Sequence, residues 1–261
     1  MNILSINHNK HEEAHFPSLS TLLKVINNRH GNFPITNDGL SIKTIRFGDD
    51  EAPVRKVVRR SNYRQSYQFF SKKMPKKTMS CESLIEFKGC YILETSPEIE
   101  SYQMQPAVIT YTLSGETHRH VPDALVKLVN GTTCFIEFKP ESELEDEDII
   151  TRTELLRINL PTHGYGYLVI CDAQVTGVSL HNAELLFHSQ KSEIPKITRM
   201  RIRDVFKSNS VLTLGNLLTI FSKEQQIQDY LYQLMLDGHI GYNIEEIITK
   251  ETFVCWKGGV K

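Results

Sequence analysis

The chain has 261 residues, which is long enough for one large domain or two modest ones, each with its own core. Its apolar fraction of 40% and charged fraction of 23% are typical of a globular protein and exclude a disordered tail or a membrane protein. The 30 basic and 31 acidic residues give a net charge of −1, an average that by itself indicates no nucleic-acid partner.

Targeting signals and cysteines narrow the class of protein further. No stretch approaches the roughly 18 uncharged apolar residues that a membrane-spanning helix requires, so no membrane partner is expected. The first residues, 1–13, lack the apolar core of a signal peptide. The five cysteines are odd in number, widely spaced and never arranged as CxxC, which argues against a disulfide framework and a zinc knuckle. We therefore expect a cytoplasmic protein.

Positive charge is concentrated in residues 52–80, which we call the basic segment and which contain no acidic residue. The aromatic residues Tyr63, Tyr67, Phe69 and Phe70 lie between its cations. This combination suits a surface that follows a phosphate backbone, because cations displace counterions and rings stack on sugars or bases. A solvated basic face is the alternative. The candidate DNA-binding residues are Arg55, Lys56, Arg59, Arg60, Arg64, Lys72, Lys73, Lys76 and Lys77.

Helices and strands follow the basic segment in an alternating order. Apolar residues recur at helical spacing from about Cys81, and Pro97 limits the extent of this helix. Asn130-Gly131 predicts a hairpin between two strands, and a further helix is predicted at about 148–158. The predicted strands are 107–113, 124–129, 132–139 and 167–171. This order predicts an α/β fold with a mixed sheet and flanking helices.

The character of the sequence changes after about residue 190. Residues 191–209 carry six cations and two acids and are interpreted as a basic connector. Helices at 212–221 and 225–236, followed by short strands at 240–244 and 252–256, have the order of a winged-helix domain. We therefore expect three parts, namely an N-terminal extension (1–54), a catalytic domain (55–190) and a winged-helix domain (191–261).

The residues best suited to catalysis are Asp123 and the segment Glu137-Phe138-Lys139. In a strand, residues two apart share a face, so Glu137 and Lys139 project together while Phe138 turns into the core. Two acids and a lysine, with a third acid from the preceding helix, form a hard oxygen site for Mg²⁺ or Mn²⁺. Such a metal activates water for phosphodiester hydrolysis, and Lys139 would hold or polarise that water.

The hairpin geometry provides an internal check on this site. With a loop of only Asn130-Gly131, Asp123 would lie opposite Phe138 and point away from Glu137. A one-residue bulge or a three-residue loop, for which the glycine is well placed, moves Asp123 opposite Lys139 and onto the metal-binding face. We expect such a bulge or longer loop.

The residues around this site resemble the TnsA family, the endonuclease subunits of heteromeric, Tn7-like cut-and-paste transposases, in both order and spacing. The motifs that carry the resemblance, over about residues 55–190, are Arg59-Arg60-Ser61, Ser71-Lys72-Lys73-Met74, Cys81-Glu82-Ser83-Leu84-Ile85-Glu86, Tyr91-Ile92-Leu93-Glu94, Ser96-Pro97-Glu98-Ile99, Gln105-Pro106, Pro122-Asp123 and Glu137-Phe138-Lys139-Pro140. The resemblance implies a restriction-endonuclease-like fold that cleaves the 5′ strands at transposon ends with Mg²⁺, or with Mn²⁺ in its place. It also implies transposon-end DNA, a TnsB-type integrase-fold transposase and a TnsC-type AAA+ ATPase regulator as partners.

Carried over residue by residue, the resemblance assigns catalytic roles to Glu86, Asp123, Glu137 and Lys139, with the three acids as metal ligands. Some family members have glutamine at the position of Glu137, and an acid there is closer to the general nuclease pattern. The helix glutamate is the open assignment, because Glu82 and Glu86 stand four apart and share a helix face. Glu86 is favoured because it lies eight residues before Glu94, which leaves Glu82 as a capping carboxylate.

Two other functions fit the same residues, a stand-alone restriction or repair nuclease and a catalytically silent DNA-binding adaptor. The intact acids and lysine argue against the silent adaptor. His118 and His120 are interpreted as surface or phosphate contacts rather than as a general base. Gln105 is interpreted as a structural residue beside Pro106, with orientation of the loop near the metal site as the alternative. The last fifty residues are not conspicuously basic, so we expect the winged helix to dock on a protein rather than on DNA.

Overall fold

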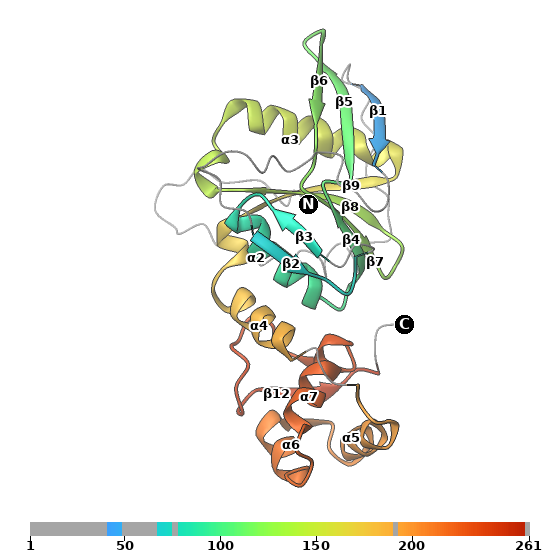
Figure 1. The fold of residues 1–261 in the computed structure, drawn as a ribbon, viewed down its shortest axis with the longest axis vertical. Coiled ribbons are helices and arrows are strands. Elements are labelled where there is room, and N and C mark those ends of the chain that lie inside the picture. The colour runs from blue at the N-terminus through green and yellow to red at the C-terminus, as the bar shows by residue number, and fades with distance from the viewer. Residues whose placement is uncertain (1–40, 49–66, 75–77, 190–192, 259–261) are drawn as a thin grey trace.

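The computed structural model describes residues 41–48, 67–74, 78–189 and 193–258. Its centre is a four-stranded sheet in the order β4 (Ile99–Met104), β7 (Ala124–Leu128), β8 (Thr133–Lys139) and β9 (Tyr165–Cys171). The first three strands are antiparallel neighbours, whereas β9 runs parallel to β8. The predicted mixed α/β sheet is therefore confirmed (Figure 1).

Helices cover both faces of this sheet (Figure 1). Helix α2 (Leu84–Thr95) lies on one face, and its Gly89 approaches β8 so closely that a Cβ there would come within 2.4 Å of the Phe138 ring. Helix α3 (Glu147–Asn159) lies on the other face and packs on β9. Phe138 belongs to the core under α2, as predicted, so the alternating residues Glu137 and Lys139 project toward α3.

A second sheet continues from the first. It has three strands in the order β1 (Ile42–Phe47), β5 (Ala107–Leu113) and β6 (Glu116–His120), all antiparallel. Of these strands only β5 is among the predicted elements. The remaining elements of this part are β2 (Tyr67–Phe70), β3 (Thr78–Cys81), α4 (Gly177–His188) and the 3₁₀ turns η1 (Glu141–Glu143), η2 (Leu160–His163) and η3 (Asp172–Val175).

The β7–β8 hairpin has the longer loop that the site requires. Leu128 donates its N–H to the carbonyl of Thr132 at 2.8 Å, which leaves three residues, 129–131, in the loop. Gly131 has a φ of +85°, a value that glycine adopts without strain. The register pairs Ala124 with Ile136, and its extension by one residue places Asp123 opposite Glu137. Asp123 therefore shares the face of Glu137 as predicted, but the expectation that it lies opposite Lys139 is wrong by one pair of residues.

The C-terminal part is built of three helices and three short strands. Helix α5 (Lys196–Ser208) replaces the predicted basic connector, because Thr198, Ile202 and Phe206 form a buried stripe at helical spacing. The following elements are β10 (Val211–Thr213), α6 (Leu214–Ile220), α7 (Ile227–Leu236), β11 (Ile240–Tyr242) and β12 (Phe253–Trp256). The three strands form an antiparallel sheet in the order β10-β12-β11.

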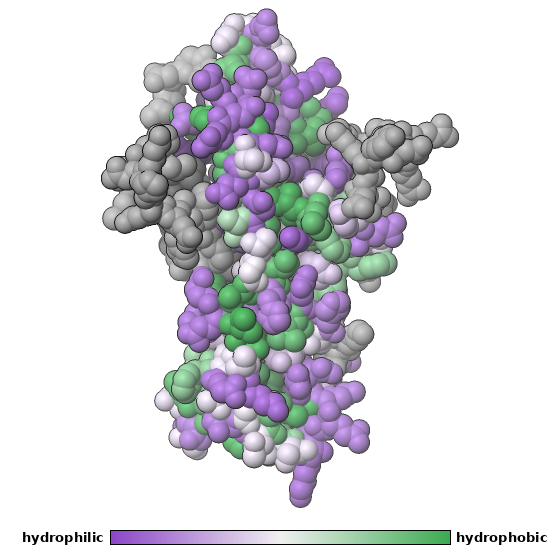
Figure 2. Space-filling view, turned by 90° about the vertical axis from the view of Figure 1, so that its left-hand side faces the viewer, coloured by the Kyte–Doolittle hydropathy of each residue, from purple (hydrophilic) through white to green (hydrophobic). Residues whose placement is uncertain are grey.

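Helix α4 joins the two parts of the molecule. Its Ala183 packs in the core under α2, and its Leu186 packs in the core of the C-terminal part. Asn182 is buried and uses both ends of its amide, donating to the carbonyl of Glu246 at 2.9 Å and accepting from the N–H of Ile248 at 3.0 Å. Hydrophobic residues reach the surface near this junction (Figure 2). Among the helices that the structure describes, none is both long enough and apolar enough to span a membrane.

Candidate active site

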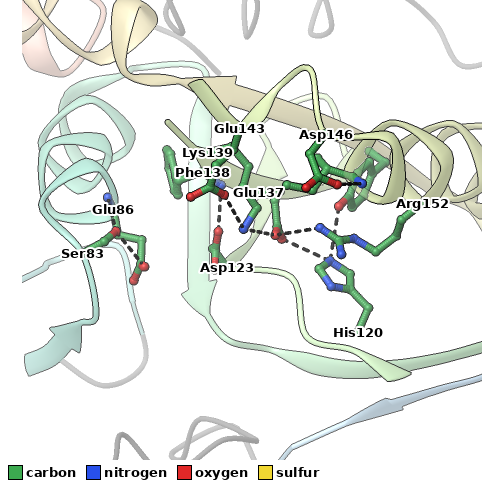
Figure 3. A network of polar contacts seen from close by, with 12 residues as sticks. Ser83, Glu86, His120, Asp123, Glu137, Phe138, Lys139, Glu143, Asp146 and Arg152 are labelled. Atoms are coloured by element: carbon green, nitrogen blue, oxygen red, sulfur yellow. Dashed lines mark hydrogen bonds and ion pairs between the residues drawn. The ribbon is translucent and has the colours of Figure 1, made fainter. Parts of the chain in front are cut away.

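Asp123 lies where the chain passes from the second sheet into the first, immediately before β7. One of its oxygens, Oδ2, accepts a hydrogen bond from the N–H of Phe138 at 2.7 Å, which fixes the carboxyl group against β8 (Figure 3). Burial raises the pKa of Asp123 well above its usual range, and the charges of Glu137 and Glu86 raise it further. The carboxyl group of Asp123 is therefore held among like charges, a condition that a bound cation would relieve.

Glu137 is the centre of a cluster of charged side chains and is only 4% exposed. The Nζ of Lys139 lies 3.2 Å from its Oε1, the Nε2 of His120 lies 3.1 Å from its Oε2, and the Nη2 of Arg152 lies 3.8 Å from Oε1 (Figure 3). Burial alone would raise the pKa of Glu137, but the contacts with His120 and Lys139 outweigh burial, so the pKa is lowered. The structure thus brings Asp123, Glu137 and Lys139 together in the way the sequence predicts.

Two further side chains beside Glu137, those of His120 and Arg152, belong to residues that the sequence did not assign to the site. His120 was interpreted as a surface or phosphate contact, yet its Nε2 also lies 3.2 Å from the hydroxyl of Tyr167. The neighbouring His118 stacks instead on Tyr111, outside the site. Arg152 lies in the acid-rich helix α3, where no local pattern distinguishes it from a solvated residue. Only the fold, which packs α3 on β9 beside β8, brings Arg152 to Glu137.

Glu86 is buried, 7% exposed, and its carboxylate is held at the start of α2 by hydrogen bonds from Ser83, the N-cap residue, and from Glu82. Its Oε1 accepts from the hydroxyl of Ser83 at 2.8 Å and its Oε2 accepts from the N–H of Glu82 at 2.9 Å. The Ser83 hydroxyl in turn accepts from the N–H of Glu86 at 3.2 Å. Burial raises the pKa of Glu86 despite these hydrogen bonds, and the charges of Glu82 and Glu137 add to the increase.

The expected relation between Glu82 and Glu86 is corrected by this geometry. Ser83 is the N-cap of α2, so Glu82 precedes the helix and does not share a helix face with Glu86. The capping side chain is Ser83 and not Glu82, whose Oε1 accepts a hydrogen bond from the side-chain amide of Gln105 at 3.1 Å. In the close view, Glu86 stands apart from the cluster around Glu137 (Figure 3).

The donor atoms of this site suit a hard divalent cation, although they are not gathered around one point. Among the described residues, no group of three or more His, Cys, Asp or Glu side chains is arranged to hold a metal. The chemistry nevertheless fits Mg²⁺ or Mn²⁺, because Asp123 and Glu137 share a face and their mutual repulsion would be relieved by a cation.

The basic segment can be judged at only two of its nine cations. Lys72 is exposed, and its backbone N–H donates to Glu94 at 2.9 Å. Lys73 is turned into the protein, where its Nζ donates to the carbonyl of Ser96 at 2.6 Å, and burial lowers its pKa to about 8. This placement gives Lys73 a role at the end of α2 in place of the predicted contact with DNA. The candidates outside the described residues are Arg55, Lys56, Arg59, Arg60, Arg64, Lys76 and Lys77.

Comparison with known proteins gives one match to this part of the chain. Residues 96–169 match the family described as TnsA-like endonuclease N terminal. The matched range contains Asp123, Glu137 and Lys139, and it also contains His120 and Arg152, whereas α2 with Glu86 precedes it. The search of curated proteins found no match.

Proposed function

We propose that the chain, of which residues 96–169 match the TnsA-like endonuclease family, is a metal-dependent DNA endonuclease of cut-and-paste transposition. Its substrate is DNA at transposon ends, where it cleaves the 5′ strands together with a separate transposase subunit. The observation that carries the proposal is the convergence of Asp123, Glu137 and Lys139 on one face of the sheet, with His120 and Arg152 beside them.

Each side chain of the site has a task in phosphodiester hydrolysis. The residues that would hold Mg²⁺ or Mn²⁺ are Asp123, Glu137 and Glu86, and the bound metal supplies an activated water and stabilises charge on the phosphate. Lys139, 23% exposed, can hold or polarise the attacking water from its position beside Glu137. Arg152 and Lys139 place positive charge where negative charge develops on the scissile phosphate.

We further propose that residues 55–190 form a restriction-endonuclease-like domain after an N-terminal extension (1–54), and that residues 191–261 form a winged-helix domain. The order helix, strand, helix, helix, strand, strand of the C-terminal part supports a winged helix. Seven of the ten residues of α7 are buried, which leaves little of this helix to enter a DNA groove. Four cations of α5 lie within 4 Å of acids, among them Arg201 beside Glu224 at 2.6 Å and Lys207 beside Asp204 at 2.8 Å.

These features favour protein docking by the C-terminal part. Its partners in our proposal are a TnsB-type transposase or a TnsC-type AAA+ regulator, while the remaining cations of the basic segment contact transposon-end DNA. When exposed cations already form ion pairs with acids of the same protein, their contacts with DNA phosphates add little binding free energy through counterion release.

The decisive experiment is cleavage of transposon-end DNA by the purified chain with its transposase, in Mg²⁺ or Mn²⁺, with the Asp123→Ala variant beside the wild type. We expect 5′-strand cleavage by the wild type and none by the variant. Equal cleavage by both proteins would overturn the active-site assignment. Strong cleavage by the isolated chain, without the transposase, would instead favour a stand-alone nuclease.

A further inference from the structure

Two neighbouring chain segments pass between the two sheets next to Asp123. Strands β4 and β7 of the first sheet continue into β5 and β6 of the second, through residues 105–106 on one chain segment and 121–123 on the other. The backbone N–H of Gln105 donates to the carbonyl of Asp123 at 2.8 Å, so the two crossing segments are bonded to each other. The position of Asp123 therefore depends on the conformation of Gln105.

Gln105 occupies a bulge at this crossing. Between the pairs Met104–Ala124 and Ile109–His120, one segment has the residues 105–108 and the other only 121–123. Gln105 has a φ of +47°, a left-handed value that glycine or asparagine adopts much more readily than glutamine. Bulges beside active sites redirect side chains, and this one lies directly opposite Asp123.

The side chain of Gln105 faces the other half of the site. It is 6% exposed, and its Nε2 donates to Oε1 of Glu82 at 3.1 Å. The N–H of Glu82 in turn donates to the carboxylate of Glu86 at 2.9 Å. The Oε1 of Gln105 is buried without a hydrogen-bond partner in the described part of the chain. Two unfavourable features, the left-handed backbone and the unpartnered oxygen, thus coincide at one residue between Asp123 and the start of α2.

We propose that Gln105 is a positioning residue of the nuclease centre, which sets the separation between Asp123 and the acids at the start of α2. Its backbone holds the strand acid, and its carboxamide holds Glu82 and, through Glu82, the segment that carries Glu86. Glycine would satisfy the bulge with less strain, so the side-chain contact accounts for a glutamine at this place. The inference rests on the proposed nuclease function for its consequence, but the contacts can be tested without cleavage.

The test compares Gln105→Gly and Gln105→Asn with a matched control. Both variants relieve the backbone, and only asparagine keeps a carboxamide, one methylene shorter. The control is Ser114→Gly, because Ser114 has a φ of +50° at the exposed tip of the β5–β6 hairpin, away from the site. The three measurements are thermal stability, Mn²⁺ binding to the metal-free chain without DNA, and hydrogen exchange of the Phe138 amide, which donates to Asp123.

We expect Gln105→Gly to be at least as stable as the wild type, to bind Mn²⁺ about tenfold more weakly, and to exchange the Phe138 amide faster. Gln105→Asn should lie between the two, and Ser114→Gly should match the wild type in Mn²⁺ affinity and in exchange. Wild-type Mn²⁺ affinity and wild-type Phe138 exchange in Gln105→Gly would overturn the inference. A wild-type chain that neither binds Mn²⁺ nor cuts DNA would overturn the proposed function, and faster Phe138 exchange in Gln105→Gly would still support the positioning contact.

Discussion

At the scale of single residues, the fold shifts the pKa values of two neighbouring acids in opposite directions. Asp123 has a raised pKa because of burial and of the charges of Glu137 and Glu86. Glu137 has a lowered pKa because His120 and Lys139 outweigh its burial. In the metal-free site, the surroundings therefore stabilise the ionised form of Glu137 and destabilise the ionised form of Asp123.

The first prediction concerns Asp123→Asn. The pKa of Asp123 is higher in the folded protein than in the unfolded chain, so ionisation of this group opposes folding as the pH rises through and above its unfolded value. We expect the variant to unfold at higher urea concentration than the wild type at pH 7, by roughly 1 kcal/mol in the absence of metal, with a smaller gain at acidic pH. Urea titrations at several pH values measure this gain, with exposed Glu116→Gln as the control. A loss of stability at pH 7 would contradict the prediction.

The second prediction concerns Glu137→Gln. Removal of this buried charge leaves Lys139 and Arg152 without their common counter-charge and His120 without its carboxylate partner, so we expect a loss of about 3 kcal/mol of folding stability at pH 7. The pKa of Glu137 is lowered by folding, so its stabilising contribution is present above the unfolded pKa and is lost as the pH falls through the folded one. The difference between variant and wild type should therefore shrink in acid. A difference that is independent of pH would show that packing, not charge, holds Glu137.

At the scale of elements, the start of α2 decides where Glu86 lies. The Ser83 hydroxyl accepts from the N–H of Glu86 and donates to its carboxylate, which also accepts from the N–H of Glu82. Thr213 is the N-cap of α6 in the C-terminal part and forms a capping box with Asn216. The two N-caps allow the cost of a lost cap to be separated from the effect on the site.

The third prediction uses this pair of caps. Ser83→Ala and Thr213→Ala should each lower the free energy of unfolding by about 1 kcal/mol, measured by urea denaturation. Only Ser83→Ala should also slow DNA cleavage, because it releases Glu86, whereas the cap of α6 touches no residue of the site. Equal cleavage rates in the two variants would argue that Glu86 needs no fixed position.

Elements with a strong local signal could be predicted from the sequence, and the others could not. Asn130-Gly131 located the β7–β8 hairpin, and the need to bring Asp123 to the face of Glu137 predicted a bulge or a longer loop, of which the structure has the three-residue loop. Strand β6 was missed because its polar residues carry no apolar alternation, and its pairing with β5 is what makes it a strand. Helix α5 was missed because its cations hide the spacing of Ile202 and Phe206.

The site was predicted to the extent that it lies on one hairpin. Asp123, Glu137 and Lys139 are close in the pairing of two strands, so local rules bring them together. The sequence predicts that the helix begins near Cys81, whereas the structure begins α2 at Leu84, after the N-cap Ser83, so Glu86 lies in the first turn. Arg152 lies on a helix in another layer of the fold, and no local sequence pattern indicates that it reaches the site.

At the scale of the whole molecule, one amide connects the catalytic part to the C-terminal part. Asn182 of α4 is 3% exposed and binds both Glu246 and Ile248. A cavity of about 190 Å³ lies beside it, lined by residues of both parts, including Ser96 and Tyr242. The contact between the parts thus combines the two specific hydrogen bonds of Asn182 with a cavity beside them.

The fourth prediction concerns Asn182→Ala. The variant leaves the buried N–H of Ile248 without its acceptor, so we expect a loss of about 2 kcal/mol of stability and earlier proteolytic cleavage of the C-terminal part. Asn159→Ala is the control, because Asn159 donates only to the carbonyl of Leu155 within its own helix. Limited proteolysis followed by mass spectrometry locates the first cuts. Unchanged cuts in Asn182→Ala would mean that apolar packing alone holds the parts together.

The position of α4 between two cores has a consequence for cooperativity. Ala183 and Leu186 lie one helical turn apart but belong to different cores, so neither core can melt without loosening the same helix. The two parts on either side of the expected domain boundary near residue 190 should therefore not unfold independently. Heating should produce a single transition across the described parts. A chain cut at that boundary would retain every strand of the catalytic sheet and yet expose the apolar side of α4, which makes it prone to aggregate.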